Sequence, residues 1–369
     1  MGMKIAIVRG SYFNKFEMQN YEPLYNKFNI VGFSGLRSIH SEFKFPVKKL
    51  ASPVDLPNFP LKMPILNRLF LGDAMYLFNL EKNLKGFDLV HTRETYFHFT
   101  QQALKAKRLG YIKKVVCTCS ETIPFNHEGI WNRKKFKKRA IKEVDKFHCL
   151  TQKAKECLLR EGCDPKKITV FPYGVDLKSF KPLGMNHKFD IFRLLFVGRF
   201  VKEKGIYDLL KILFLLLKSG KKVKLVMVGK GPEKSKIISL INQSEYGDDI
   251  EFKTVDYKDM AKEYQEANLL CLLSKKNKFW EEYFGMVLIE AMASGLPVLT
   301  TKSGGIPEVV GNAGILIKPG DYKTGFREVV KLIDQKDYYF KKSQESLVRA
   351  QNLFDSNEVA RNIEKLWKS

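Results

Sequence analysis

The sequence lacks the short motifs that mark several common functional classes. Its six cysteines form no Cys-x-x-Cys pair and its six histidines form no His-Glu-x-x-His motif, so no zinc site is indicated. The glycine-rich stretch at residues 229–233 lacks the lysine and hydroxyl of a phosphate-binding P-loop, and no GxGxxG follows the first expected strand. No signature of an RNA- or DNA-binding module is present. These absences disfavour metal-dependent hydrolases, Walker-type ATPases and sequence-specific nucleic-acid binding.

The sequence also has no apolar stretch of the roughly 18 residues that a membrane-spanning helix needs. The apolar segment at residues 4–8 is too short for a signal peptide and is typical of a first strand. An apolar helix expected near residues 65–80 has two alternatives, packing in the core or dipping into lipid, of which the core is the expected one. We therefore expect a cytoplasmic protein, either freely diffusing or peripheral on the inner face of the cell membrane.

Negative charge is scarce. The 369 residues carry a formal net charge of +24, and residues 1–183 hold 33 Lys and Arg against 16 Asp and Glu. Such a basic half favours an anionic partner: a membrane surface, an acidic acceptor or nucleic acid. A basic amphipathic helix is expected between Arg133 and Lys142, beside Trp131. This helix is either an ordinary solvated face or a contact to an anionic membrane, and the charge excess favours the membrane.

Short apolar runs alternate with helical patterns along the whole chain. This alternation predicts an α/β fold with two doubly wound parallel sheets, and the length fits two domains. We expect a first domain over residues 1–183, a hinge near residues 183–188 and a second domain over residues 190–352. A helix in residues 353–369 is expected to cross back to the first domain. The expected strands cover residues 4–8, 29–33, 87–90, 115–118, 146–150, 168–171, 193–197, 224–228, 250–253, 269–273 and 296–300.

The most informative stretch is residues 279–310, FWEEYFGMVLIEAMASGLPVLTTKSGGIPEVV. It predicts a loop, a helix that starts near Gly285, a strand, a Gly-Gly turn and a second helix. The free N–H groups and partial positive charge of helix N-termini suit a phosphate or diphosphate. Glu282 lies just before the first helix. Glu290 lies inside it among apolar residues, where its carboxylate needs hydrogen-bond donors.

Two further sheet edges carry polar residues. Gly198 and Arg199 follow the strand at residues 193–197, and Lys204 comes five residues after Arg199. In parallel sheets ligands bind at the carboxyl ends of strands, so these two cations are candidates for a diphosphate. In the first domain, Gly10 follows the first strand, where a glycine lets a ligand approach the backbone. Arg93 and Glu94 end the strand near residue 90 and are candidate acceptor contacts.

Glu282 and Glu290 are separated by seven residues within EYFGMVLIEAMASGLPVLTTKSGGIPEVV, and this stretch resembles the retaining glycosyltransferases of family four. The resemblance implies a GT-B fold, in which two Rossmann-like domains face a central cleft, and a nucleotide-sugar donor. It implies that residues 1–183 form the acceptor-binding domain and that residues 190–352 form the nucleotide-sugar-binding domain. It implies that Arg199 and Lys204 bind the donor diphosphate, that Glu290 binds the ribose and that Glu282 is a catalytic residue contacting the sugar. The implied donor-binding set is Gly198, Arg199, Lys204, Glu282, Phe284, Gly285, Met286, Val287 and Glu290.

The sequence departs from the family after the strand at residues 115–118. That exit often holds a His-Asp or His-Glu pair in the family, whereas this chain has Ser120 and Glu121, with His127 six residues beyond Glu121. Either Glu121 takes the polar catalytic role or the alignment is displaced. We accordingly expect Glu121 as a second catalytic residue and His127 as an acceptor contact.

The resulting expectation is a hexosyltransferase that moves a sugar, with retention, to a glycan, a lipid-linked or another cell-envelope acceptor. No cofactor or metal is expected, because Arg199 and Lys204 replace a divalent ion and no DxD motif occurs. No nucleic-acid partner is expected. Two alternatives stay open: another activity of the same fold, such as a phosphorylase or epimerase, or a basic membrane- or nucleic-acid-binding protein with an idle site.

Overall fold

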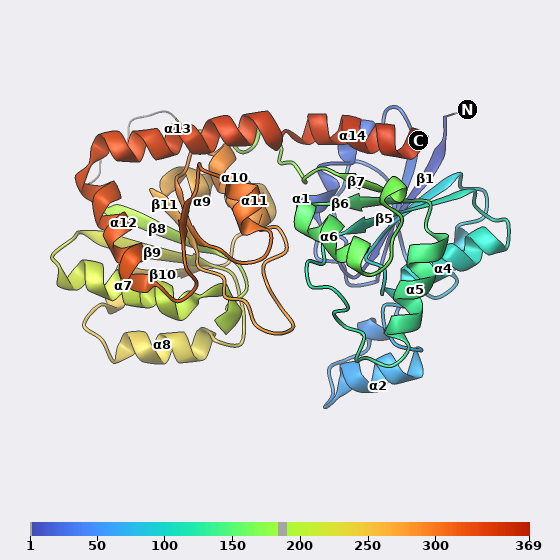
Figure 1. Cartoon of the computed structure of the whole chain (residues 1–369). Helices are drawn as coiled ribbons and strands as arrows, with labels where there is room; N and C mark the ends of the chain where they lie inside the picture. Colours follow the sequence, from blue (N-terminus) through green and yellow to red (C-terminus); the bar gives the residue numbers. More distant parts are fainter. Residues whose placement is uncertain (1, 184–189) are drawn as a thin grey trace. The chain divides into compact units, whose positions relative to one another are not determined.

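The computed structural model describes residues 2–183 and 190–369, which form two compact units (Figure 1). The first unit combines Met1–Tyr173 with Ser356–Ser369, and the second is Gly174–Asp355. The chain thus changes unit at residue 174, before the expected boundary at 183, and again at residue 356. Residues 184–188 of the expected hinge lie outside the described residues.

The earlier boundary follows from backbone and aromatic contacts of residues 174–183. The Val175 N–H donates to the Phe354 carbonyl at 2.7 Å, and Val175 forms a parallel bridge with Asp355. The Phe180 ring packs against the rings of Tyr257 and Tyr264 at 5.9 Å each. These contacts tie the segment to the second unit.

The first unit is built on a seven-stranded parallel sheet in the order β3-β2-β1-β4-β5-β6-β7. Apart from the short edge strand β3, these strands overlap the expected runs. The strands are β1 (Lys4–Gly10), β2 (Asn29–Ser34), β3 (Val47–Lys49), β4 (Leu89–Arg93), β5 (Lys114–Cys119), β6 (Lys146–Cys149) and β7 (Ile168–Val170).

Successive side chains of each strand point to opposite faces of the sheet, so the core of the first unit has two layers. On β1, Ala6 and Val8 pack into a cluster with helices α3 to α6, whereas Ile5 and Ile7 pack into a cluster that includes Trp367 of the last helix. Burial on both faces explains the continuous apolar strands. The helices of this unit are α1 (Lys15–Met18), α2 (Lys62–Leu69), α3 (Leu80–Asn83), α4 (His98–Arg108), α5 (Arg133–Glu143), α6 (Gln152–Arg160) and α14 (Ser356–Lys368), with 3-10 turns η1 (Glu22–Leu24), η2 (Pro53–Asp55) and η3 (Pro165–Lys167).

One helix expectation in this unit is wrong. The apolar helix expected at residues 65–80 is α2, which ends at Leu69, and most of its side chains are exposed rather than in the core. The error arises because an apolar run does not reveal where a helix stops. The basic helix expected between Arg133 and Lys142 is α5, which ends at Glu143.

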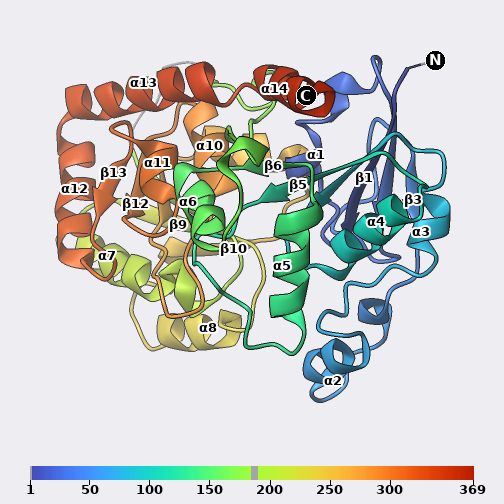
Figure 2. The same ribbon diagram turned by 45° about the vertical axis from the view of Figure 1, so that its right-hand side comes forward.

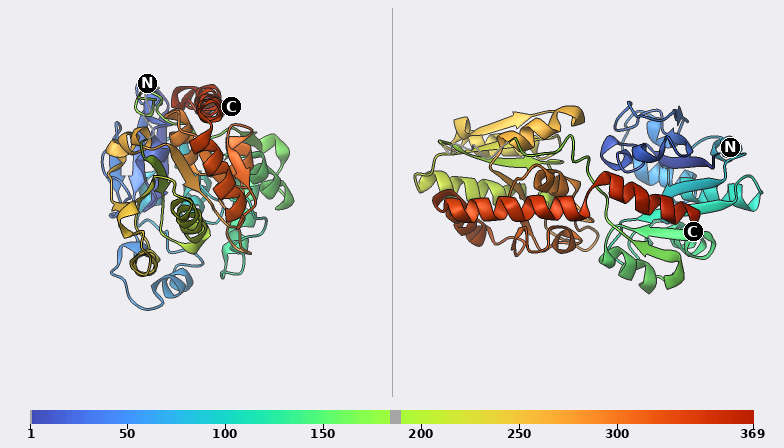
Figure 3. Two further views of the ribbon diagram at one scale, coloured as in Figure 1. Left: turned by 90° about the vertical axis from the view of Figure 1, so that its left-hand side faces the viewer. Right: turned by 90° about the horizontal axis from the view of Figure 1, so that it is seen from above.

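The second unit contains a six-stranded parallel sheet in the order β10-β9-β8-β11-β12-β13. Its strands are β8 (Phe192–Val197), β9 (Val223–Val228), β10 (Ile250–Lys253), β11 (Leu269–Leu272), β12 (Val298–Thr301) and β13 (Ile315–Ile317). Helix α7 packs against α12, and α10 against α13, which runs along the outside of the unit (Figure 3). The helices are α7 (Ile206–Lys218), α8 (Lys234–Asn242), α9 (Met260–Glu266), α10 (Met286–Ala293), α11 (Ile306–Val310), α12 (Tyr322–Asp334) and α13 (Lys336–Leu353), with 3-10 turns η4 (Lys202–Lys204), η5 (Gly247–Asp249) and η6 (Tyr257–Asp259).

A buried chain of hydrogen bonds fixes α14 to the first sheet. The Trp367 indole N–H donates to His91 Nδ1 at 3.0 Å, and His91 Nε2 lies 2.8 Å from Thr118 Oγ1. Thr118 Oγ1 in turn lies 3.2 Å from Nδ1 of His148, whose Nε2 lies 2.8 Å from the Phe171 carbonyl oxygen. Because an indole only donates, His91 Nδ1 accepts, so His91 is neutral and carries its proton on Nε2. Because a carbonyl only accepts, His148 also carries a proton on Nε2.

This chain predicts a loss of stability in mild acid. Burial lowers the pKa of His148 to about 3, and burial followed by the Arg9 charge also lowers that of His91. In the unfolded chain each histidine gains its proton below a pH of about 6.5, while the folded chain does not. Stability should therefore fall as the pH decreases from about 6.5 toward 3. His148 should account for about 2 kcal/mol of this loss at pH 5, and His91 adds a loss of the same sign.

Urea unfolding of the wild type and of His148→Leu at pH 7.5 and 5.0 checks this prediction. The wild type should lose more free energy of unfolding between the two pH values than the variant, by about 2 kcal/mol. An equal loss in both proteins would show that His148 does not carry the pH dependence.

Candidate active site

In the second unit, the carboxylate of Glu282 lies at the centre of a cluster of polar groups. Glu282 Oε2 accepts hydrogen bonds from Lys204 Nζ at 2.6 Å and from Ser274 Oγ at 2.9 Å. Its backbone carbonyl accepts the Gly305 N–H at 2.8 Å. Lys204 follows β8, Ser274 follows β11 and Gly305 follows β12. The cluster therefore forms where the ends of these three strands meet, with β11 between β8 and β12 in the sheet.

Two glycines make this close approach possible. Gly205 and Gly304 have φ values of +71° and +56°, in the left-handed region that favours glycine. A Cβ on Gly205 would lie 1.9 Å from the Leu273 carbonyl oxygen, and one on Gly304 would lie 1.9 Å from the Glu282 carbonyl oxygen. Any larger residue would push Lys204 or the Gly304–Gly305 turn away from Glu282.

Helix α10 starts next to this cluster, with Gly285 as its N-cap at φ +85°. Phe284 is buried and packs edge-on against Phe354, whereas Met286 and Val287 in the first turn are partly exposed. The first N–H groups of a helix have no partner within the helix. No side chain in the described part of the chain caps this end, so its N–H groups suit an anion.

Glu290 is buried at 3% exposure, and tyrosines contact both of its carboxylate oxygens. The Tyr257 hydroxyl donates to Oε1 at 2.9 Å and the Tyr264 hydroxyl donates to Oε2 at 2.7 Å. Burial raises the pKa of Glu290, and the two tyrosine hydrogen bonds partly oppose that rise. The two tyrosine hydroxyls are thus the hydrogen-bond donors that a buried Glu290 carboxylate needs. Of these two tyrosines, Tyr257 is partly exposed.

Arg199 is exposed and, among the described residues, forms no ion pair. It follows Gly198, which has φ +151°, at the carboxyl end of β8. Its guanidinium is therefore available to a ligand. By contrast the Lys204 ammonium, which lies on the same connection, is held by Glu282 and lies 5.5 Å from the centre of the Trp280 ring.

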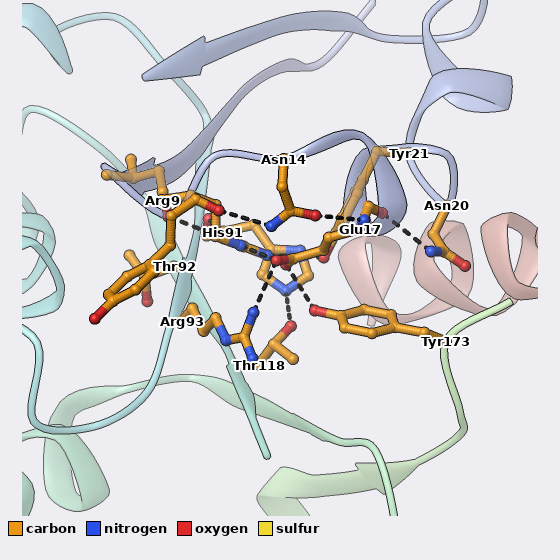
Figure 4. A network of polar contacts seen from close by, with 12 residues as sticks. Arg9, Asn14, Glu17, Asn20, Tyr21, His91, Thr92, Arg93, Thr118 and Tyr173 are labelled. Carbon is orange, nitrogen blue, oxygen red and sulfur yellow. Dashed lines mark hydrogen bonds and ion pairs between the residues drawn. The ribbon is translucent and has the colours of Figure 1, made fainter. Parts of the chain in front are cut away.

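In the first unit, Arg93 belongs to a largely buried network at the carboxyl ends of β1 and β4 (Figure 4), and Glu94 lies next to it in the chain. Arg93 donates to Glu17 Oε2 at 3.0 Å and to Ser120 Oγ at 3.3 Å. Glu94 Oε1 accepts from the backbone N–H of Ser120 at 2.9 Å and from its hydroxyl at 2.6 Å. The structure thus joins the two acceptor candidates through Ser120.

Gly10, where a ligand was expected to approach the backbone, packs against two side chains, and its role as an acceptor contact stays a prediction. Gly10 is buried with φ +55°, and a Cβ there would lie 3.2 Å from Met75 Cε and 3.5 Å from the Phe99 ring. The packing of these two side chains occupies the space over this glycine.

Glu121 and His127, whose relation the sequence left open, are in contact. His127 Nε2 lies 3.3 Å from Glu121 Oε2, which also accepts from the Asn126 side chain at 2.9 Å. Burial opposes ionisation of Glu121, but the hydrogen bonds from His127 and the Ile123 N–H outweigh it, so the pKa of Glu121 is lowered. His127 has a positive φ of 63° and a partly exposed side chain. The pair forms because the loop after β5 folds back on itself.

Sequence reasoning missed several partners of the candidate residues. Ser274 follows the end of β11, a position where ligand-binding residues are common, and this signal was available. Tyr264 and Glu17 gave no signal, because their contacts with Glu290 and Arg93 join residues that are 26 and 76 positions apart. Neither a metal-binding group of three or more His, Cys, Asp or Glu nor a helix able to cross a membrane occurs in residues 2–183 and 190–369.

Comparisons with known families and structures agree with this geometry. The family model described as Glycosyl transferases group 1 matches residues 180–351, and the model described as Glycosyltransferase Family 4 matches residues 39–179. The chain is 25% identical over 247 residues to a phosphatidylinositol N-acetylglucosaminyltransferase subunit from Arabidopsis thaliana, covering 66% of this chain and 54% of the relative. It is 28% identical over 176 residues to N-acetyl-alpha-D-glucosaminyl L-malate synthase of Bacillus anthracis, covering 47% and 44%.

The chain spans about half the length of these curated relatives. Among solved structures, Anabaena HepE in complex with UDP and glucose superimposes with a TM-score of 0.78 at 16% identity, over 100% of both chains. That likeness, with the two parallel-sheet units, confirms the expected GT-B fold. Through the two models that match consecutive parts of it, the chain belongs to the group 1 glycosyltransferases of the family 4 type.

Proposed function

We propose that this protein is a retaining glycosyltransferase that uses a nucleoside-diphosphate sugar. The observation that carries the proposal is the cluster of Lys204, Ser274 and Glu282 beside the uncapped start of α10. It combines a cation, a carboxylate and free helix amides at one sheet edge, as a sugar diphosphate requires. The UDP and glucose found with Anabaena HepE support this class of donor.

In this proposal Arg199 and Lys204 stabilise the negative charge that develops on the departing diphosphate. An ammonium has three donors, and the hydrogen bond to Glu282 uses one of them, so others remain for phosphate oxygens. Arg199 adds a guanidinium fork, which matches phosphate oxygens in pairs. The start of α10, at Gly285, Met286 and Val287, supplies amides. Because these groups carry positive charge, we expect transfer to continue when divalent ions are chelated.

The proposed role of Glu290 is to hold the ribose hydroxyls. Each carboxylate oxygen has two acceptor positions, and a tyrosine hydroxyl fills one on each. A ribose hydroxyl would share Oε1 with Tyr257 or displace it. We therefore assign Tyr257 to the ribose end of the donor site.

Glu282 is proposed to orient the sugar through its hydroxyls rather than to attack it, because Lys204 and Ser274 already hold its carboxylate. In a front-face transfer the bond between the anomeric carbon and the diphosphate oxygen breaks, and the acceptor hydroxyl oxygen bonds to the same face. The acceptor proton passes to the departing phosphate oxygen. This sequence balances atoms and charge and retains the anomeric configuration.

The acceptor is proposed to bind at the carboxyl edge of the first sheet, near Arg93, Glu94 and the Glu121–His127 pair. A glycan, lipid-linked or other cell-envelope acceptor is favoured. The Arabidopsis relative is named for phosphatidylinositol, and another relative is a capsular polysaccharide glycosyltransferase of Staphylococcus aureus. Association with an anionic membrane surface belongs to the same proposal.

The experiment is a screen of nucleotide-sugars for thermal stabilisation, followed by measurement of nucleoside-diphosphate release with acceptors. Arg199→Ala and Glu290→Ala should each lower transfer at least roughly tenfold, since each removes one donor contact. Lys230→Ala, an exposed cation after β9, is the control and should stay near the wild-type rate. Wild-type rates in both donor-site variants, or phosphate-dependent cleavage without release of nucleoside diphosphate, would contradict the proposal.

A further inference from the structure

Helix α2 and its flanking residues expose an unusual amount of apolar surface in the first unit. Leu61 is 71% exposed, Leu69 is 68% exposed and Leu71 is 51% exposed, whereas Leu66 is the buried residue of the helix. Both Figure 1 and Figure 2 show α2 extending past the end of α5, away from the sheet. The exposed apolar side chains of this patch, called here the α2 patch, are Phe59, Leu61, Met63, Ile65, Leu69 and Leu71.

The α2 patch is held in place rather than loosely attached. The Asn132 side chain donates to the Leu71 carbonyl at 2.8 Å, and Arg133 Nε donates to the Gly72 carbonyl at 2.9 Å. Arg133 also pairs with the buried carboxylate of Asp73 at 3.0 Å. These bonds fasten the end of the patch to the start of α5, beside Trp131, whose side chain is 59% exposed.

Cations outnumber carboxylates around the α2 patch, although Glu81, Glu128 and Glu143 lie close to it. Residues 56–72 contain no Asp or Glu but include Lys62 and Arg68. Helix α5 adds a row of exposed cations: Lys134, Lys135, Lys138, Arg139 and Lys142. An apolar surface surrounded by cations complements an anionic bilayer, which offers negative headgroups above hydrocarbon.

A pocket of about 380 Å³ opens between the α2 patch and α5. Aromatic side chains form much of its wall: the Tyr76 ring lies 4.9 Å from that of His98, which lies 5.2 Å from that of Phe136. Lys105, Arg108 and Arg139 line it together with one carboxylate, that of Glu81. Lys105 pairs with Glu81 and Arg108 pairs with Glu143, so Arg139 is the lining cation that forms no ion pair among the described residues. The pocket thus combines an aromatic wall with a cation at its edge, which suits part of a lipid chain and its anionic headgroup.

We propose that the α2 patch, together with Trp131 and the exposed cations of α5, docks this protein on an anionic lipid bilayer. This changes the expectation that the helix between Arg133 and Lys142 itself lies on the membrane. The apolar side chains of α5, Phe136 and Ala140, are buried in the unit, and Lys137 is buried against Glu161. Helix α5 therefore provides positive charge at the headgroups, while the apolar side chains of α2 insert into the bilayer. Docking at a bilayer would bring the enzyme to a lipid-linked acceptor, and this consequence rests on the proposed transferase function.

The test is binding of the full chain to vesicles of phosphatidylglycerol and phosphatidylcholine, compared with phosphatidylcholine alone, measured by flotation without any nucleotide-sugar. The paired variant Leu61→Asn/Leu69→Asn should bind the anionic vesicles at least roughly tenfold more weakly. Each cation near an anionic surface strengthens binding about fivefold, so the pair Lys138→Gln/Arg139→Gln should bind roughly 25-fold more weakly. Its binding should also depend less on salt.

Matched controls come from the second unit. Ile238→Asn/Leu240→Asn removes two exposed apolar side chains of α8, and Lys222→Gln/Lys236→Gln removes two exposed cations. Both should bind like the wild type, and circular dichroism should show all variants folded.

Equal binding of wild type and α2 variants, or equal binding to neutral and anionic vesicles, would overturn the proposal. The proposal would also be overturned if the wild type were a dimer and the Leu61→Asn/Leu69→Asn variant a monomer, because a second copy of the chain would then cover the patch. Because flotation uses no donor, failure here leaves the transferase proposal standing, and failure of catalysis leaves the docking surface standing.

Discussion

Replacing Lys204 with alanine is expected to lower kcat/KM for sugar transfer by about 100-fold or more, the largest effect among the donor-site variants. Removal of one preorganised group that stabilises charge in a transition state typically lowers kcat by about 100- to 1,000-fold. Lys204 also holds Glu282 at 2.6 Å, so the variant loses both the positive charge and the position of that carboxylate. Steady-state release of nucleoside diphosphate measures the effect.

Lys202→Ala is the matched control, because Lys202 lies on the same 3-10 turn, is exposed and forms no ion pair among the described residues. The control should keep its rate within about twofold of the wild type, since surface charges away from a site change little. The Lys204→Ala protein should melt near the wild-type temperature. Comparable rates in the two variants would remove Lys204 from the site.

The second large effect concerns stability. Glu17→Ala is expected to lower the free energy of unfolding by about 3–5 kcal/mol, as happens when a buried ion pair loses one partner. Glu17 is 1% exposed and pairs with Arg9, which is fully buried, and with Arg93. Its Oε1 also accepts the Tyr173 hydroxyl at 2.6 Å. Burial opposes ionisation, but the two arginines outweigh it and lower the pKa of Glu17.

Equilibrium unfolding in urea at pH 7.5 measures the Glu17 effect. Glu42→Gln serves as its control, because Glu42 pairs with Lys15 at 3.2 Å but its side chain is 83% exposed. Such a surface pair contributes at most about 1 kcal/mol. If both variants unfolded at the same urea concentration, the buried network of Figure 4 would not be a source of stability.

Most strands could be predicted from the sequence because their apolar runs are bounded by polar or glycine residues. Among the described residues, β3 and β13 were missed. Each is three residues long, and Val47 is the one apolar residue of β3. The composition of β3 does not differ from that of a loop, so only its pairing with β2 identifies it. Strand β13 is apolar throughout, but three residues show no periodicity, and its pairing with β12 identifies it.

The candidate site was predicted unevenly. The spacing of Glu282 and Glu290 and the order of Arg199 and Lys204 are visible in the chain, because they lie within single loop-helix connections. The contact between Lys204 and Glu282 joins residues 78 positions apart and was not predicted. The same holds for the tyrosines on Glu290. No local pattern carries these contacts, because parallel strands are joined through helices and their ends meet only in the sheet.

The sequence by itself determined the α/β class, two sheets and the residue types at their carboxyl edges, because alternating apolar periodicity and glycine positions are local properties. Tertiary structure alone decided which charges are neutralised and which remain available. Glu17 binds two arginines, Glu290 two tyrosines, while Arg199 stays exposed. It also decided that α2 is exposed while the apolar face of α5 is buried. Burial depends on what packs against a side chain, and that partner lies elsewhere in the chain.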